Sequence, residues 1–218
     1  MRMCTALLAG LCLAARVAAA QEPTPVLPGD RDASAELAKI IAATRAHHLP
    51  VDPILEKVQY AIVMRAPAAR IVAAARAIAA RLEIARDALA PRDYPADVAA
   101  GEGALSYNVP KVVLTTIRNA SPEPSVVVPL GALTQLVASG VSVTRASDIV
   151  TSLIRRGASG QQLASFSNDV NSDVRLGGRP DDALNVRMRG LTAALAPAGQ
   201  AAVTQAITTG AAAPPKKP

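Results

Sequence analysis

Apolar residues recur along most of this chain at steps of three and four residues, the spacing of one face of an α-helix. The longest such stripe runs from Ile71 through Leu82 to Leu89. Shorter stripes begin at Leu55, Leu130, Ala146, Leu163 and Leu184. Each stripe covers only one side of its helix and must be buried against a neighbouring helix. The pattern therefore predicts an all-α fold.

The predicted helices follow one another at a nearly constant interval. A helix of about 11 residues with a tight connection fills one unit, so consecutive helices are expected to be antiparallel. The fold class we predict is short antiparallel helices in tandem units of about 17 residues, as either a solenoid-like stack or an irregular helical bundle. The units begin near Asp32, Leu49, Ala66, Asp93, Val109, Val126, Val141 and Ala158.

Residues typical of helix ends separate the stripes. Asp52 before Pro53 suits an N-cap followed by proline at the first helical position. Ser159 and Gln162 fit a capping box, in which each side chain bonds the other's backbone N–H. Helices are expected to stop where glycine permits the left-handed conformation, at Gly140, Gly157 and Gly177.

The first 20 residues have the three parts of a secretory signal peptide. Arg2 supplies the positive start, residues 6–15 form a short apolar run, and residues 18–20 are alanines suited to cleavage. Arg16 interrupts the apolar run before it reaches membrane-spanning length. We therefore predict an exported protein, periplasmic or extracellular, with no transmembrane segment after cleavage.

Both cysteines, Cys4 and Cys12, lie in this predicted signal peptide. Leu11 precedes Cys12 and is too large for a lipid-attachment site, which disfavours a lipoprotein. The mature chain would have no thiol, so the sequence predicts neither disulfides, nor thiol catalysis, nor cysteine-ligated zinc in it.

The rest of the chain divides into one domain with a simple segment at each end. Residues 21–31 are rich in proline and are expected to form a flexible leader. Residues 209–218 consist mainly of Ala, Pro and Lys and are expected to form a disordered tail. Residues 32–208 are predicted to form a single α-helical domain.

Charge and aromatic content narrow the classes of partner. The net charge is +6, and loss of Arg2 and Arg16 would lower it by two to +4, too small and dispersed to indicate nucleic-acid binding. There is no Trp, and few aromatic rings are present on which bases or sugars could stack. These rings are Tyr60, Tyr94, Tyr107 and Phe166.

Two groups of polar residues resemble metal sites only superficially. His47 and His48 are adjacent and would point about 100° apart on a helix, so they suit a helix C-terminus better than a metal ion. Asp169, Asn171 and Asp173 resemble the start of a calcium loop, but the required glycine and glutamate are missing. These acidic residues are better interpreted as a solvated helix face.

Two glycine-containing motifs also lack the context for catalysis or cofactor binding. Ser159 between Gly157 and Gly160 follows no predicted strand, which a nucleophile elbow needs. Gly101 and Gly103 do not complete a dinucleotide fingerprint and are expected to permit close helix packing instead. The sequence thus predicts no catalytic residue, no cofactor and no metal site.

Arginines concentrate in one stretch of the chain. If Arg65 and Arg76, and likewise Arg70 and Arg81, shared a helix face, they could line a groove for an anionic partner. Arg stems also cover apolar helix surface while the charge stays in water, which is the alternative interpretation. The candidate contacts to an anion or partner are Arg65, Arg70, Arg76, Arg81 and Arg86, with Arg92 next in the series.

Two hypotheses about function follow from the sequence, and a third, an enzyme with an unfamiliar site near His47 and His48, ranks below them. The first is an exported, non-enzymatic helical scaffold or protein-interaction module of the cell envelope, since stacked helices bind through shape and scattered side chains. The alternative is a carrier of a small apolar or anionic ligand held between helices.

Overall fold

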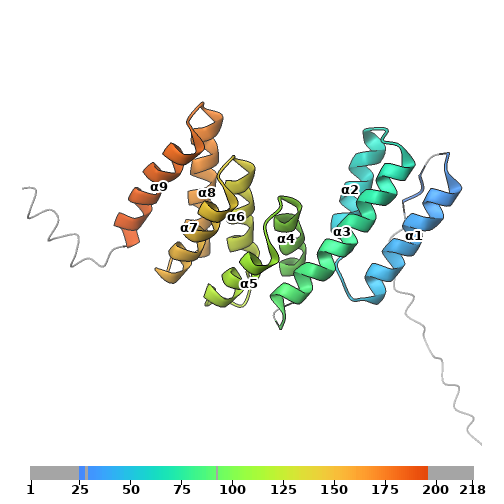
Figure 1. Cartoon of the computed structure of the whole chain (residues 1–218), viewed down its shortest axis with the longest axis horizontal. Coiled ribbons are helices and arrows are strands. Elements are labelled where there is room, and N and C mark those ends of the chain that lie inside the picture. Colours follow the sequence, from blue (N-terminus) through green and yellow to red (C-terminus); the bar gives the residue numbers. More distant parts are fainter. Residues whose placement is uncertain (1–24, 28, 92, 196–218) are drawn as a thin grey trace, which may run out of the picture.

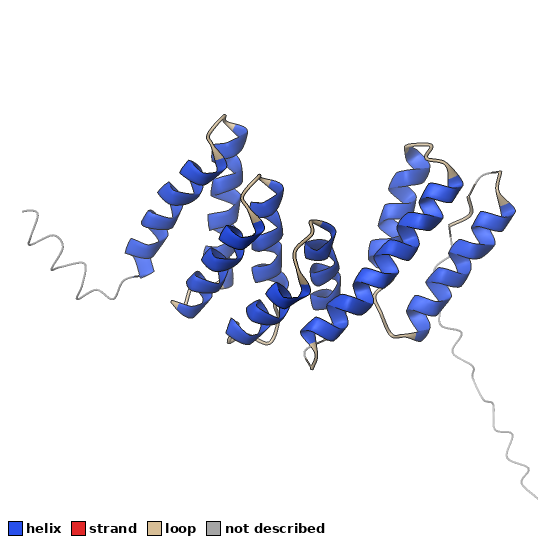
Figure 2. Ribbon diagram, viewed as in Figure 1, coloured by secondary structure: helices blue, strands red, loops and turns tan. Residues whose placement is uncertain are grey.

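The computed structural model describes residues 25–27, 29–91 and 93–195 (Figures 1 and 2). The predicted signal peptide, the tail over 209–218 and the domain boundary at 208 lie outside these residues. The all-α prediction is confirmed, and the described residues contain no strand. The helices are α1 (Arg31–Ala46), α2 (Asp52–Val63), α3 (Ala68–Leu89), α4 (Pro95–Ser106), α5 (Lys111–Ala120), α6 (Val127–Ala138), α7 (Val143–Arg155), α8 (Gly160–Arg175) and α9 (Pro180–Leu195).

The helices form two layers in an open stack. In one layer α1 packs on α3, α3 on α5 and α5 on α7, and in the other α4 packs on α6 and α6 on α8. Among the described residues, every pair of helices with extensive contact lies one or two positions apart in the chain. The first and last helices therefore stand at opposite ends of a row, as Figure 1 shows. Of the two predicted arrangements, this is the solenoid-like stack.

The predicted units agree with the helices, and most of the predicted helix ends are confirmed. Ser159 and Gln162 form the capping box, with the Ser159 N–H donating to Gln162 Oε1 at 2.8 Å. Asp52 is a correction: it is the first helical residue of α2, the N-cap is Val51, and no side chain caps this end. The glycines expected to end helices take φ values of +93°, +83° and +99°, at Gly140, Gly157 and Gly177.

The long helix α3 organises the first half of the stack. Its predicted stripe from Ile71 to Leu89 is buried as expected. With 22 residues α3 is about 33 Å long, so α2 and α4 contact different parts of it. Gly101 of α4 lies against the C-terminal half, where an added Cβ would stand 3.0 Å from Ala85 Cβ. The expectation of close packing is thus confirmed for Gly101, but it is wrong for Gly103, which faces open space.

A buried carboxylate fixes α4 relative to α6. Asp97, in the first turn of α4, accepts hydrogen bonds at Oδ1 from Ser125 Oγ at 2.8 Å and from the Val126 N–H at 2.9 Å. Val126 is the N-cap of α6, so the Asp97 side chain holds the start of that helix. Because Asp97 is only 1% exposed and its bond to the Val126 N–H is buried, this contact sets the position of α4 more firmly than a surface contact would.

The predicted leader differs from the structure at its C-terminal end. Leu27 is only 2% exposed and belongs to the hydrophobic core. Its N–H donates to Ser34 Oγ at 3.0 Å, and α1 begins at Arg31. Burial of the Leu27 side chain at the edge of the helix stack removes apolar surface from water, and this stabilises the fold. The expectation of a flexible leader up to residue 31 is therefore wrong for Leu27.

Candidate functional site

A groove lies between α2 and α4, with α3 as its floor. It has a volume of about 530 Å³. The layer is continuous from α4 through α6 to α8, whereas α2 and α4 make no extensive contact. The groove is thus a gap in an otherwise regular layer. It is lined by Pro53, Glu56, Lys57, Tyr60, Ile78, Arg81, Glu102 and Ser106.

An ion pair lies in the groove where α3 meets α4. Arg81 donates from Nε and Nη2 to Glu102 Oε1, at 2.9 and 2.8 Å. Glu102 is only 7% exposed, and a carboxylate this deeply buried needs a charged donor to offset its lost hydration. The pair fixes the α4 wall of the groove and leaves the partly exposed guanidinium at its surface.

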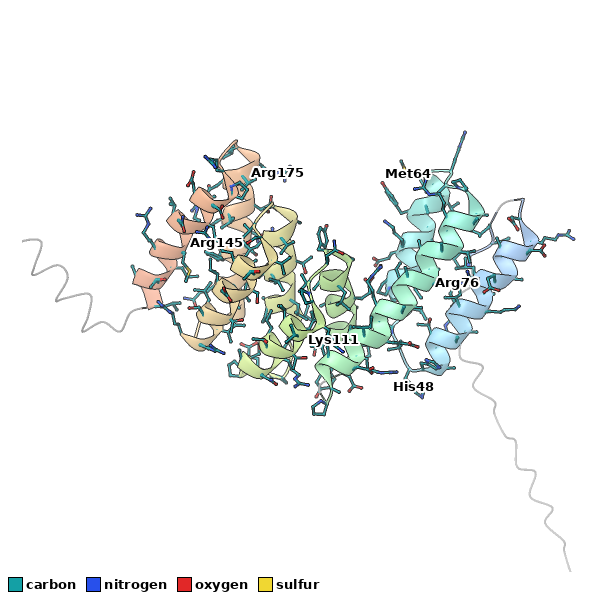
Figure 3. All side chains as sticks on the ribbon, in the orientation of Figure 1. His48, Met64, Arg76, Lys111, Arg145 and Arg175 are labelled. Atoms are coloured by element: carbon teal, nitrogen blue, oxygen red, sulfur yellow. The ribbon has the colours of Figure 1, made fainter. Side chains whose placement is uncertain are left out.

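The opposite wall exposes large apolar side chains. Tyr60 on α2 is 60% exposed, and Lys57 Nζ lies 5.5 Å from the centre of its ring. Val63 and Met64 lie outside the groove lining, at the C-terminal end of α2, and are 78% and 62% exposed; Figure 3 shows Met64 at the tip of the helix. Adjacent exposed side chains of this size are typical of an interaction surface.

The five predicted contact arginines do not share one surface. Arg65 lies in the turn after α2 with a φ of +52°. The expectation that it faces the same way as Arg76 on one helix is therefore wrong. Arg76 turns toward α1, where its Nη2 donates to Glu36 Oε1 at 2.8 Å (Figure 3). This hydrogen bond lowers the pKa of Glu36.

The remaining arginines have separate surroundings. Arg81 turns into the α2–α4 groove, and Arg86 pairs with the neighbouring Asp87 at 3.2 Å. Arg70 is exposed and lies 11 residues before Arg81 on α3, hence about three turns away on the same side. Arg92 lies outside the described residues. Whether these side chains contact a partner stays a prediction.

The histidines follow the end of a helix, as expected. His47 is the C-cap of α1, and His48 follows with a φ of +57°. His47 Nδ1 lies 3.0 Å from Glu83 Oε1 on α3. This contact ties the end of α1 to the next helix of its layer. Across the described ranges, no group of three His, Cys, Asp or Glu side chains could hold a metal ion.

The acidic residues of α8 form helix-to-helix contacts. Asp173 accepts from Arg187 Nε at 2.7 Å and from Nη2 at 2.8 Å, while Asp169 lies 3.4 Å from Nη1. Hydrogen bonding to Arg187 lowers the pKa of Asp173, and the same bond raises the pKa of Arg187. Both carboxylates thus lie on a helix, as the sequence indicated, and pair with α9.

The sequence alone did not indicate that α2 forms one side of the candidate site. Its pattern predicted the buried stripe of α2 from Leu55 but indicated no role for Lys57 or Tyr60. The available signal was the position of Tyr60 and Met64, which are large apolar residues outside that stripe and one turn apart. Glu102 gave no signal, because its partner Arg81 lies 21 residues away.

No known protein family matches this chain, and neither a curated protein nor a solved structure is significantly similar to it. The class of protein therefore rests on the fold, a solenoid-like stack of antiparallel helices in two layers. Over the part of the chain that the structure covers, no helix has both the length and the apolarity to cross a bilayer.

Proposed function

We propose that this chain is an exported, non-enzymatic protein-interaction module, and that the groove between α2 and α4 holds a segment of its partner. One observation carries the proposal: the layer that packs continuously from α4 to α8 is interrupted between α2 and α4. Export is proposed from the sequence of residues 1–20 alone.

The chemistry of the groove supports a protein partner. Tyr60 offers a rigid aromatic surface with a polar tip, a residue type enriched at the energetic centre of interfaces. Lys57 and Arg81 provide cations and Glu56 a carboxylate around it. Such mixed contacts suit a peptide segment, which carries apolar side chains together with backbone and side-chain polar groups.

Site-specific photo-cross-linking in the native cells tests this proposal. The full chain carries p-benzoylphenylalanine in place of Tyr60, and the matched control carries it in place of Val112, which is exposed on α5 away from the groove. We expect a discrete protein adduct from position 60 and none from position 112. The charge reversal Lys57→Glu should reduce that adduct. Equal labelling from both positions, or none from position 60, contradicts the proposal.

The alternative, a carrier of a small apolar or anionic ligand, predicts a different result. A carrier usually buries most of its ligand, whereas the α2–α4 groove is open to solvent and a tighter hollow beside Leu163 has about 20 Å³, room for one water. Native mass spectrometry of gently purified protein should then show a retained small mass. Such a mass, without a protein adduct at position 60, would favour the carrier.

A further inference from the structure

The turn between α2 and α3 carries a second surface, which shares no residue with the lining of the α2–α4 groove. Val63 is the last residue of α2 and Met64 its C-cap, and both side chains are mostly exposed. In Figure 1 this turn stands at the outer edge of the row, beyond the neighbouring turn between α4 and α5. We call Val63, Met64, Arg65 and Arg70 the α2–α3 tip. It is independent of the function proposed for the groove.

The α2–α3 tip is positively charged. No acidic residue occurs from 57 to 82, a stretch that contains one lysine and four arginines. Two of these arginines, Arg76 and Arg81, pair with carboxylates of neighbouring helices. Arg65 and Arg70 are exposed and make no ion pair with any residue that the structure describes. The tip therefore presents two guanidinium groups with no carboxylate partner next to two exposed apolar side chains.

The backbone at Arg65 is unfavourable for an arginine. Its φ of +52° lies in the left-handed region. In the turns after α6 and α8 the residue at the same place is glycine, Gly140 and Gly177, which takes this conformation without steric cost. A residue with a Cβ is strained there. An arginine at such a position, against a cost in stability, points to a role for its side chain.

A small apolar pocket lies beside Arg65. It is lined by Leu27, Ile62, Arg65, Ala66, Ala68 and Ile71. Its volume is about 240 Å³, roughly eight times the volume of a water molecule in the liquid. Arg65 is the only charged residue of this lining, and the carboxylate of Asp30, near Leu27, accepts from the Ala33 N–H as the N-cap of α1. An apolar pocket beside a cation suits a molecule with an apolar chain and an anionic head group.

These features together fit the surface of an anionic lipid bilayer. Exposed apolar side chains enter the head-group region of a bilayer, and arginines beside them bind lipid phosphates. A stable protein interface usually takes about 20–30 residues a side, whereas the exposed apolar part of the tip consists of two side chains. A bilayer needs no such area of fitted contacts, because its anionic and apolar layers are continuous.

We propose that the α2–α3 tip docks on an anionic membrane surface, with Val63 and Met64 in the head-group region and Arg65 and Arg70 on lipid phosphates. The absence of acidic residues from 57 to 82 removes the repulsion that a carboxylate would add at such a surface. With two cations and two apolar side chains, binding is reversible and weakens as salt screens the charges.

Insertion of the tip is measured with the environment-sensitive fluorophore NBD on the full chain. Cys4 and Cys12 are the only cysteines, so replacing both with serine gives a thiol-free background. NBD is attached at Met64→Cys or, as the matched control, at Val112→Cys, because Met64 is 62% and Val112 64% exposed. Vesicles contain phosphatidylcholine alone or an equal mixture with phosphatidylglycerol. Both labelled chains carry the same residues 1–20, so any effect of that segment is common to them.

We expect a blue shift with increased emission at position 64 on the mixed vesicles, and little change at position 112 or with phosphatidylcholine alone. Replacing both arginines of the tip, Arg65→Gln with Arg70→Gln, should weaken binding to the mixed vesicles by roughly tenfold or more. The matched variant Arg155→Gln with Arg156→Gln removes the same charge from the exposed end of α7, and its binding should be unchanged.

Three results would overturn the proposal. Equal emission changes at positions 64 and 112 would mean that the chain adsorbs without a fixed orientation. Equal losses of binding in the two arginine variants would mean that net charge alone attracts the chain to the vesicles. No change at position 64 on either vesicle would leave the tip to a protein partner. Circular dichroism establishes that each variant retains its helices.

Discussion

Single atoms decide how closely α4 approaches α3. At Gly101 an added Cβ would stand 3.0 Å from Ala85 Cβ and 3.2 Å from a methyl carbon of Leu89 and of Leu114. At Gly103, two residues later on the same helix, an added Cβ would meet nothing within 4 Å. The two glycines of α4 thus differ: Gly101 has no space for a side chain, whereas Gly103 has ample space.

We predict opposite effects of alanine at these two positions. Gly103→Ala should raise the free energy of unfolding by about 0.5–1 kcal/mol, because alanine favours the helix and fits without contact. Gly101→Ala has the same helix gain but forces α4 away from α3, and overpacking costs about 1–3 kcal/mol, so we expect a net loss. Urea denaturation measures both. An equal gain in the two variants would contradict the close approach of α4.

At the scale of elements, α9 is attached to α8 by a charged contact on a partly exposed surface. Arg187 bonds both oxygens of Asp173, at 2.7 and 2.8 Å. The bond lowers the pKa of Asp173 in the folded chain. A carboxyl with a lowered folded-state pKa stabilises the fold above its unfolded pKa, and this contribution is lost as the pH falls through the folded value.

We therefore predict that Asp173→Asn lowers the melting temperature near neutral pH and weakens its fall on acidification. The expected change is small, because exposed ion pairs contribute little. Thermal melts followed by circular dichroism, between pH about 6 and pH about 3, cover the range in which aspartates titrate. Asp148→Asn is the control, since Asp148 is exposed on α7 and makes no ion pair within the described residues. An identical acid response in wild type and Asp173→Asn would refute the stabilising role.

At the scale of the whole molecule, contacts are restricted to near neighbours in the chain. Extensive packing joins helices one or two positions apart, and the described residues show none between the two ends of the row. Stability in such a stack is approximately a sum of unit and interface contributions. A local defect should therefore open part of the stack before the rest.

Phe166→Ala tests this locality. Phe166 is buried in α8, and removing a buried phenylalanine costs about 3–5 kcal/mol. Hydrogen exchange should show lost protection in α8 and α9, with α1 to α3 little changed. The matched variant Leu82→Ala, in the buried stripe of α3, should show the reverse. Uniform loss of protection in either variant would mean that the stack unfolds as one unit.

Part of the candidate site could be predicted from the sequence, but the arrangement of its side chains in space could not. The pattern identified Arg81 among the candidate contacts and placed it on the long helix. It did not separate Arg81, in the groove, from Arg76, which pairs with Glu36 on the other side of α3. Which carboxylate an arginine reaches depends on which helix lies beside it, and that information is not local.

The sequence by itself determined the helices, because a stripe of apolar residues, a capping box and a glycine stop each act within a few residues of chain. Tertiary structure alone decided which helices are neighbours and where the layer is interrupted. The interruption arises because α3 is long enough for α2 and α4 to pack on separate parts of it. Helix length is a local property, but the space left between two other helices depends on how all three pack.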